Sequence, residues 1–219
     1  SYYSGESKER DRLMVSLSNG VSLIAIPASD GKMAVINDAG HRRFKICHKC
    51  GYTILGNEKE ANRHNTHWNK NSKEPDCSGK LYGGLALGHE YFTDILQLRF
   101  EGYVNNNRGF WSSLLYALLE GAGKALDIER KDLDGCLYSY GDAPTLILFD
   151  DVPGGAGHVQ RIAENETRLI SVLESTLQRM KGCECDTSCC GCLRNYRNQF
   201  CHSELNRRGV IEFLEKVLS

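Results

Sequence analysis

The sequence predicts a mixed α/β (α+β) domain with a mixed sheet, flanking helices and two zinc-bound loop excursions. Segments with the spacing of strands come first, and helical and strand-like segments follow, an order typical of a mixed domain. The second observation is that most of the ten cysteines fall in two clusters. The 219 residues, 41% of them hydrophobic and 25% charged, suffice for a substantial core.

The strand predictions rest on short apolar segments. Residues 21–28 and 32–38 read as the two strands of a hairpin, because the Ser-Asp-Gly-Lys segment between them is a turn signal. Residues 96–101 alternate between apolar and polar side chains, which indicates a half-buried strand. Residues 136–140 and 145–150 complete the expected strands, and the second is apolar enough to be central in a sheet.

Helices are expected in the second half of the chain. Residues 109–126 carry apolar side chains at helical spacing and predict a buried helix. Residues 169–180 predict an amphipathic helix with Gly182 as its C-cap, and residues 210–218 predict a final helix. We expect three segments: an N-terminal strand-rich segment (1–40), a zinc-knuckle insertion (41–80) and a module that ends with the second cysteine cluster (81–219).

Composition excludes several classes of protein. The net charge is −1, so any surface for nucleic acid must be local. No apolar segment approaches the ~20 residues that a membrane span needs, and the polar N-terminus has no signal-peptide core. We therefore expect a cytoplasmic protein without membrane contact. The lack of an initial Met is what we expect of a fragment of a longer chain.

The second cysteine cluster reads CECDTSCCGC, from Cys183 to Cys192. A reducing compartment disfavours disulfides, and so many neighbouring thiols could not all pair locally without strain. The spacing Cys183-x-Cys185-x3-Cys189-x2-Cys192 suits a tetrahedral thiolate zinc site. The spacing alone leaves the choice of four sulfurs open, because Cys190 and Cys201 lie nearby.

The first cluster begins with Cys47-x2-Cys50-Gly, the usual form of a zinc knuckle, in which the glycine allows a tight turn. Cys77 is the expected third ligand. We expect His67 as the fourth ligand in preference to His64, because it is nearer to Cys77 in the sequence. The alternative is that the cysteines are simply buried and both histidines solvated. Outside both clusters, Cys136 lies in an apolar strand and is expected in the core.

No enzymatic motif stands out. The sequence has no G-x-x-x-x-G-K-[ST] phosphate loop, so ATP hydrolysis by this chain alone is not expected. The glycine-rich segment 152–157 could hold a phosphate, but a tight strand-to-helix connection is favoured because two aspartates precede it. A metal-dependent nuclease is the alternative function, in which Mg²⁺ would be held by acidic residues at element ends. These candidates are Asp94, Glu120, Asp150 and Asp151.

Local basic patches indicate DNA contact. Between His41 and Lys73, eight Lys or Arg residues face two Glu residues, with aromatic rings interleaved, which suits backbone contact and base stacking. A second basic stretch follows the second cysteine cluster. The alternatives are a solvated surface beside a metal site, or a protein-docking scaffold that never touches DNA. The residues expected to contact DNA are Lys45, Lys49, Arg63, Trp68, Arg194, Arg197, Arg207 and Arg208.

Four segments occur in an order that resembles the MrfA-type zinc-binding domain. They are ALGHEYFTDILQLRFEG, SLLYALLEGAGKALDIERKDLDGCLY, LILFDDVPGGAGHVQRI and CDTSCCGCLRNYRNQFCHSELNRRGVIEFL. This family occurs at the C-terminus of superfamily 2 DEAD/DEAH-box helicases and in the DrmB protein of the DISARM phage-defence system. The match covers roughly residues 40 to 219, and its specificity lies in the co-occurrence of the motifs.

The resemblance implies a non-enzymatic accessory module of a DNA helicase or helicase partner, acting in DNA repair or antiphage defence. The family's cysteine quartet corresponds to Cys183, Cys185, Cys189 and Cys192. The resemblance and the residues together predict two structural zinc ions, because four ligands close each shell and leave no position for a catalytic water. A superfamily 2 motor, in cis or in trans, would supply ATP hydrolysis.

Overall fold

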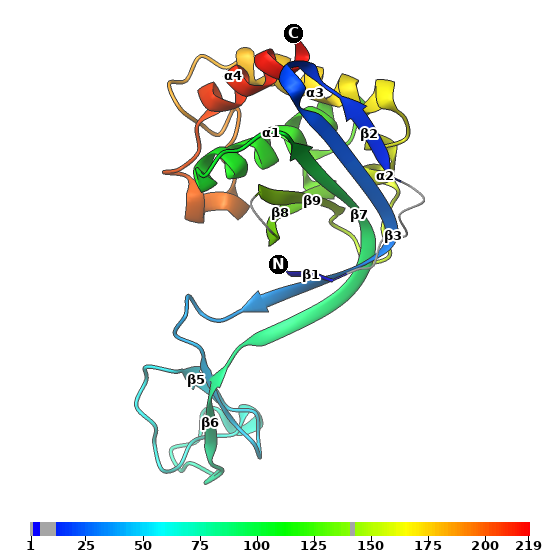
Figure 1. The fold of residues 1–219 in the computed structure, drawn as a ribbon. Coiled ribbons are helices and arrows are strands. Elements are labelled where there is room, and N and C mark those ends of the chain that lie inside the picture. Colours follow the sequence, from blue (N-terminus) through cyan, green and yellow to red (C-terminus); the bar gives the residue numbers. More distant parts are fainter. Residues whose placement is uncertain (1, 5–11, 141–142) are drawn as a thin grey trace. The chain divides into compact units, whose positions relative to one another are not determined.

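The computed structural model describes residues 2–4, 12–140 and 143–219, which form a mixed α+β fold with two sheets (Figure 1). Residues 1 and 5–11 of the expected N-terminal strand-rich segment lie outside the described residues. The chain divides into a smaller unit, Ala34–Glu90, and a larger unit, which comprises Tyr2–Met33 and Tyr91–Ser219. The expected insertion at 41–80 falls inside the smaller unit.

A six-stranded sheet has the order β1-β3-β7-β9-β8, with β2 paired to β3. The pairings of β2 with β3, β7 with β9 and β8 with β9 are antiparallel. The strands are β1 (Tyr2–Ser4), β2 (Leu13–Ser16), β3 (Ser22–Asn37), β7 (Leu87–Glu101), β8 (Leu133–Tyr140) and β9 (Ala143–Asp150).

The expected hairpin at residues 29–32 is wrong, because β3 runs through this segment as one strand of 16 residues. Gly31 serves close packing instead of a turn. A Cβ atom at this position would lie 2.5 Å from the side chain of Ile95 on β7, a distance that no real contact allows. The glycine therefore lets the two strands' side chains pack where any other residue would clash.

Alternation along β9 divides apolar side chains between two cores. Leu146 and Leu148 join the main core, whereas Ile147 and Phe149 join a smaller cluster with Met33. Successive side chains of a strand point to opposite faces, so the sheet is buried on both sides at its centre. Cys136 packs at the margin of the smaller cluster, as a partly buried residue, which agrees with its expected core position.

Helix α1 (Arg108–Leu126) is buried along almost its whole length, because it packs against β8 and β9 as well as α3 and α4. Asparagine side chains cap the N-termini of the three long helices, which the sequence reading did not anticipate. Gly182 is the C-cap of α3, as predicted. The other helices are α2 (His158–Ile162), α3 (Glu166–Lys181), α4 (Arg207–Leu218) and the 3₁₀ segments η2 (Ser18–Gly20), η3 (His67–Asn69), η4 (Arg130–Asp132) and η5 (Tyr196–Cys201).

The smaller unit contains a three-stranded sheet with the order β5-β4-β6, whereas the sequence predicts a loop-rich stretch around the first cysteine cluster. Its strands are β4 (Phe44–Cys47), β5 (Thr53–Leu55) and β6 (Leu81–Leu85). The buried core of this unit consists of three cysteines and one leucine: Cys47, Cys50, Cys77 and Leu81. Among the described residues of the whole chain, no helix is both long enough and apolar enough to span a membrane.

Candidate metal centres

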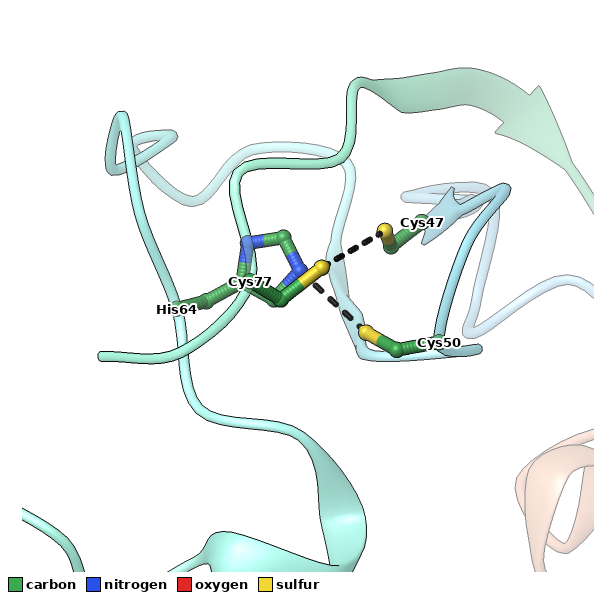
Figure 2. A group of neighbouring side chains, drawn as sticks. All are labelled: Cys47, Cys50, His64 and Cys77. Carbon is green, nitrogen blue, oxygen red and sulfur yellow. Dashed lines mark hydrogen bonds between the residues drawn. The ribbon is translucent and has the colours of Figure 1, made fainter.

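Four side chains of the smaller unit converge on one point (Figure 2). We call Cys47, Cys50, His64 and Cys77 the cysteine–histidine cluster. Each offers one ligand atom, and these atoms all lie within 4.8 Å of one another. The sulfurs of Cys47 and Cys77 are 3.8 Å apart, and the sulfur of Cys50 is 3.3 Å from Nε2 of His64.

These distances fit zinc. Sulfurs bound tetrahedrally to zinc at about 2.3 Å lie about 3.8 Å from each other, and about 3.5 Å from a bound imidazole nitrogen. A disulfide would need about 2.05 Å, and all ten cysteines are free. The donor set and its spacing therefore match a structural zinc site, not a cystine.

The local backbone explains how the knuckle forms. Gly51 adopts a φ of +74°, and its N–H donates to the carbonyl of Cys47 at 3.0 Å, which closes the expected turn. The backbone N–H groups of Lys49 and Gly79 donate to the sulfurs of Cys47 and Cys77 at 3.4 and 3.3 Å. Position 79 also requires glycine, because a Cβ atom there would lie 2.5 Å from the Cys47 sulfur.

His64, and not His67, supplies the imidazole of the cluster. His64 forms an isolated antiparallel bridge with Cys77, which brings both side chains to the same place. His64 is only 5% exposed, and its ring stacks on Tyr52 with centroids 4.4 Å apart. His67 lies in η3, where its ring contacts the exposed Trp68. Nearness in sequence pointed to His67, but backbone pairing decides which histidine faces the sulfurs.

Four sulfurs of the larger unit form a second group, the four-cysteine cluster of Cys183, Cys185, Cys189 and Cys192. The sulfur of Cys183 lies 3.4 Å from that of Cys185 and 3.5 Å from that of Cys189. The sulfur of Cys192 lies 3.6 and 3.8 Å from those of Cys185 and Cys189. These distances again suit a tetrahedral zinc–thiolate centre.

The pKa values of the thiols are shifted in both directions within the two clusters. The backbone N–H of Cys185 lowers the pKa of Cys183 to about 7, whereas burial raises the pKa of Cys192 to about 12 and also raises that of Cys185. In the cysteine–histidine cluster, burial raises the pKa of Cys47, but N–H groups of Cys50 and Lys49 outweigh it and bring the value to about 6. Cys183 and Cys47 are thus the thiols whose ionised form the protein favours, and a bound divalent metal would favour the ionised form of its ligand thiols in the same way.

The two remaining cysteines near the four-cysteine cluster are not part of it. Cys190 is exposed, and the group of converging sulfurs does not include it. Cys201 is 4% exposed within the main core, where its S–H donates to the carbonyl of Asn198 at 3.3 Å. Cys201 is thus placed as a core residue of η5.

The glycine-rich segment after β9 is filled by the protein's own carboxylates. Asp150 is fully buried and accepts from the backbone N–H groups of Ala156, His158 and Val159 at 2.7 to 3.0 Å. Asp94 accepts from the N–H of Gly157 at 2.8 Å. The amides that could have held a phosphate are therefore occupied, which agrees with the structural interpretation of this loop.

The other acidic candidates for Mg²⁺ binding are also engaged. Asp151 pairs with Arg197, and Glu120 pairs with Arg130 at 3.3 Å and Arg179 at 3.8 Å. Within the described part of the chain, the cysteine–histidine and four-cysteine clusters are the groups of three or more ligand-type side chains that converge closely enough to hold a metal. These contacts disfavour the alternative nuclease site.

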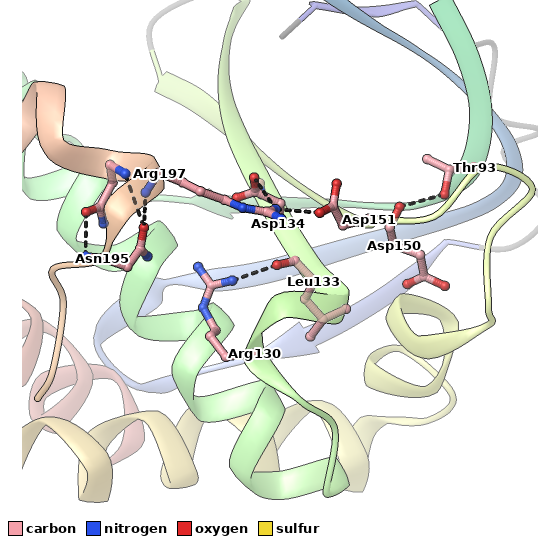
Figure 3. Close-up of polar contacts among 10 residues, drawn as sticks. Thr93, Arg130, Leu133, Asp134, Asp150, Asp151, Asn195 and Arg197 are labelled. Atoms are coloured by element: carbon pink, nitrogen blue, oxygen red, sulfur yellow. Dashed lines mark hydrogen bonds and ion pairs between the residues drawn. The ribbon is translucent and has the colours of Figure 1, made fainter. Parts of the chain in front are cut away.

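The arginines after the four-cysteine cluster bind the protein itself. Arg197 of η5 reaches Asp134 on β8, at 3.4 Å, and Asp151 after β9 (Figure 3). Arg207 donates to the carbonyls of Cys185 and Met180 at 2.8 and 3.2 Å, so it fastens the cluster to the end of α3.

The remaining residues expected to contact DNA differ in whether other protein groups engage their side chains. Arg194 donates to Ser188 at 2.8 Å, and Arg208 pairs with Asp186. Lys45 pairs with Glu60 at 3.1 Å. The other three residues of this group, all in the smaller unit, are exposed: Lys49, Arg63 and Trp68.

Comparison with known proteins places these clusters in context. Residues 114–193 match the family model described as the MrfA Zn-binding domain. The chain is 29% identical over 220 residues to Druantia protein DruE of Escherichia coli (strain UMEA 4076-1), an alignment that covers 87% of this chain and 12% of that protein. The crystal structure of DUF1998 helicase MrfA bound to DNA is similar with a TM-score of 0.50 at 16% identity, over 93% of this chain and 24% of that chain.

The chain therefore spans a small part of both relatives, and the structural likeness shows the fold alone. The four-cysteine cluster lies within the matched residues, whereas the cysteine–histidine cluster lies outside them. The resemblance noted in the sequence is confirmed to this extent: residues 114–193 match the model of the MrfA Zn-binding domain.

Proposed function

We propose that the chain is a non-enzymatic, zinc-stabilised accessory module of a superfamily 2 DNA helicase, acting in antiphage defence or DNA repair in the bacterial cytoplasm. The observation that carries the proposal is the four-cysteine cluster, which lies within the segment that matches the MrfA Zn-binding domain. The similar solved structure is that of a helicase bound to DNA, and the curated relative is a Druantia protein. Of the two pathways we favour defence, because of that relative.

The two zinc ions have a structural role in this proposal. Zinc in the four-cysteine cluster would be held by Cys183, Cys185, Cys189 and Cys192, and zinc in the cysteine–histidine cluster by Cys47, Cys50, His64 and Cys77. Four protein ligands fill a tetrahedral shell, so no position remains for a reacting water. Zinc supplies folding free energy to segments that lack an apolar core of their own.

The motor would be provided by another part of the same polypeptide or by a partner. The larger unit offers no free carboxylate pair among the acidic candidates, because protein donors engage Asp94, Glu120, Asp150 and Asp151. DNA contact is assigned to the smaller unit, where nine Lys or Arg residues face six Asp or Glu residues between positions 34 and 90.

The proposal is tested with the purified 219-residue chain. Incubated with Mg²⁺, ATP and plasmid DNA, the zinc-loaded chain should neither hydrolyse ATP nor cleave DNA. Cleavage that requires Mg²⁺ and disappears in Asp150→Ala would establish the nuclease alternative. In the natural helicase assembly, Cys189→Ser should reduce DNA-stimulated ATP hydrolysis, whereas Cys190→Ser, which alters an exposed neighbour outside the cluster, should not.

A further inference from the structure

A loop of the smaller unit presents an exposed indole. The Trp68 loop, residues 63–76, contains His64 and ends next to Cys77. A backbone bridge between these two cluster residues closes the loop: the N–H of His64 donates to the carbonyl of Cys77 at 2.9 Å, and the N–H of Cys77 donates to the carbonyl of His64 at 3.0 Å. Trp68 lies within this loop and is 68% exposed. A large exposed aromatic side chain is a common feature of binding surfaces.

Hydrogen bonds hold this loop in shape without an apolar core. Asp76 accepts from the N–H and hydroxyl of Thr66 at 2.8 and 2.7 Å, and from the side chain of Asn69 at 3.1 Å. These donors, first of all the Thr66 N–H, lower the pKa of Asp76 to about 2. Asn65 donates to the carbonyls of Lys70 and Ser72 at 3.2 and 2.8 Å. The loop is therefore organised before any partner binds, which reduces the entropic cost of binding.

The charges around the indole favour an anionic partner. Arg63, Lys70 and Lys73 are exposed on the loop, and no ion pair between described residues engages them. The loop's own carboxylates are the exposed Glu74 and Asp76, so its three cations outnumber its two anions, and the Asp76 carboxylate is engaged by hydrogen bonds within the loop. An aromatic face with neighbouring cations suits stacking on an unpaired base while the cations contact phosphates.

We propose that Trp68 stacks on a base of single-stranded DNA, with Arg63, Lys70 and Lys73 contacting its backbone and Asp76 acting as the positioning residue. This inference rests on the proposed DNA contact of the module and specifies its form. A duplex would not fit, because its bases present no free face to an indole. Binding should be independent of base sequence, since every base offers a π-face.

Fluorescence can observe this contact directly, because the chain has two tryptophans. Trp111 is 2% exposed in the main core, so an added oligonucleotide should quench Trp68 alone. The zinc-loaded chain is titrated with oligo-dT of about 15 nucleotides, and affinity is measured separately by anisotropy of a labelled strand. Trp68→Ala should weaken binding by about 5- to 100-fold and abolish the quenching. With three phosphate contacts, the slope of log affinity against log salt should be about −2.

Matched variants separate the stacking contact from general effects. Asp76→Ala should weaken binding while leaving the indole present, and Tyr196→Ala, which removes another exposed aromatic residue beside an arginine, should leave binding unchanged. Zinc content checks that each variant is folded. Equal affinity of Trp68→Ala and wild type, or equal affinity for duplex and single strand, would overturn the inference and leave the DNA contact standing. If the wild type binds neither form, the proposed DNA contact itself fails.

Discussion

Loss of the metal from the cysteine–histidine cluster should unfold the smaller unit while the larger unit remains folded. The reason is the small apolar core of the smaller unit. Apart from the three cysteines, its buried core cluster contains Leu81, and Tyr52 and Ile54 pack at its margin. Full burial of one such side chain contributes about 2 kcal/mol. Zinc binding to a structural site contributes about 10–16 kcal/mol of apparent folding free energy. A zinc ion bound here would therefore dominate the stability of this unit.

Hydrogen exchange measures the effect residue by residue. Cys77→Ser removes one ligand, and the amides of Cys47, Gly51 and His64, which are hydrogen-bonded in the knuckle and its bridge, should then exchange at the rate of an unfolded chain. Amides of the β7–β9 ladder should keep their protection, because that sheet is buried in a separate core. Cys190→Ser serves as the control. Unchanged protection of the knuckle amides in the Cys77→Ser variant would refute the reasoning.

Three further predictions concern single residues. Gly79→Ala places a methyl group 2.5 Å from the Cys47 sulfur and should lower zinc affinity at least tenfold in a competitive chelator titration. Gly83→Ala, with its nearest neighbour at 3.5 Å, serves as the control and should not lower the affinity. Equal zinc affinities of the two variants would contradict the cluster geometry. Asp150→Asn should lower the free energy of unfolding, measured with urea, by about 2–4 kcal/mol, because an amide cannot accept from all three N–H groups. The control Asp151→Asn loses an ion pair near the surface and should lower it by less than about 1 kcal/mol. In the metal-free chain at neutral pH, Cys183 should be alkylated first among the thiols of the four-cysteine cluster, because its pKa is lowered to about 7; mass spectrometry that finds uniform labelling would count against this.

Periodicity and cysteine spacing predicted much of the fold and the clusters. The buried helix at 109–126, the amphipathic helix at 169–180 and the strand at 145–150 all appear, because each carries a local apolar pattern that tertiary contacts reinforce. The knuckle turn at Gly51 was also predictable, since a Cys-x2-Cys-Gly sequence needs a positive φ at the glycine.

Contacts between distant residues could not be predicted in the same way. Residues 29–32 have a local preference for a turn, but pairing with neighbouring strands overrides it. Gly31 is needed instead for close packing on Ile95. His64 reaches the metal cluster through a backbone bridge, which sequence distance does not reveal. Arg197 is paired with carboxylates 63 and 46 residues away in the chain. The sequence therefore could not show that this arginine is engaged within the protein and not free to contact DNA.

Native mass spectrometry of the purified chain tests the central claim most directly. The claim is that two separate, closed zinc centres hold this module together. The wild type should carry about two zinc ions, Cys77→Ser and Cys189→Ser should each carry one, and the double variant should carry none. Wild-type protein without zinc, or single variants that both retain the full complement, would contradict the claim.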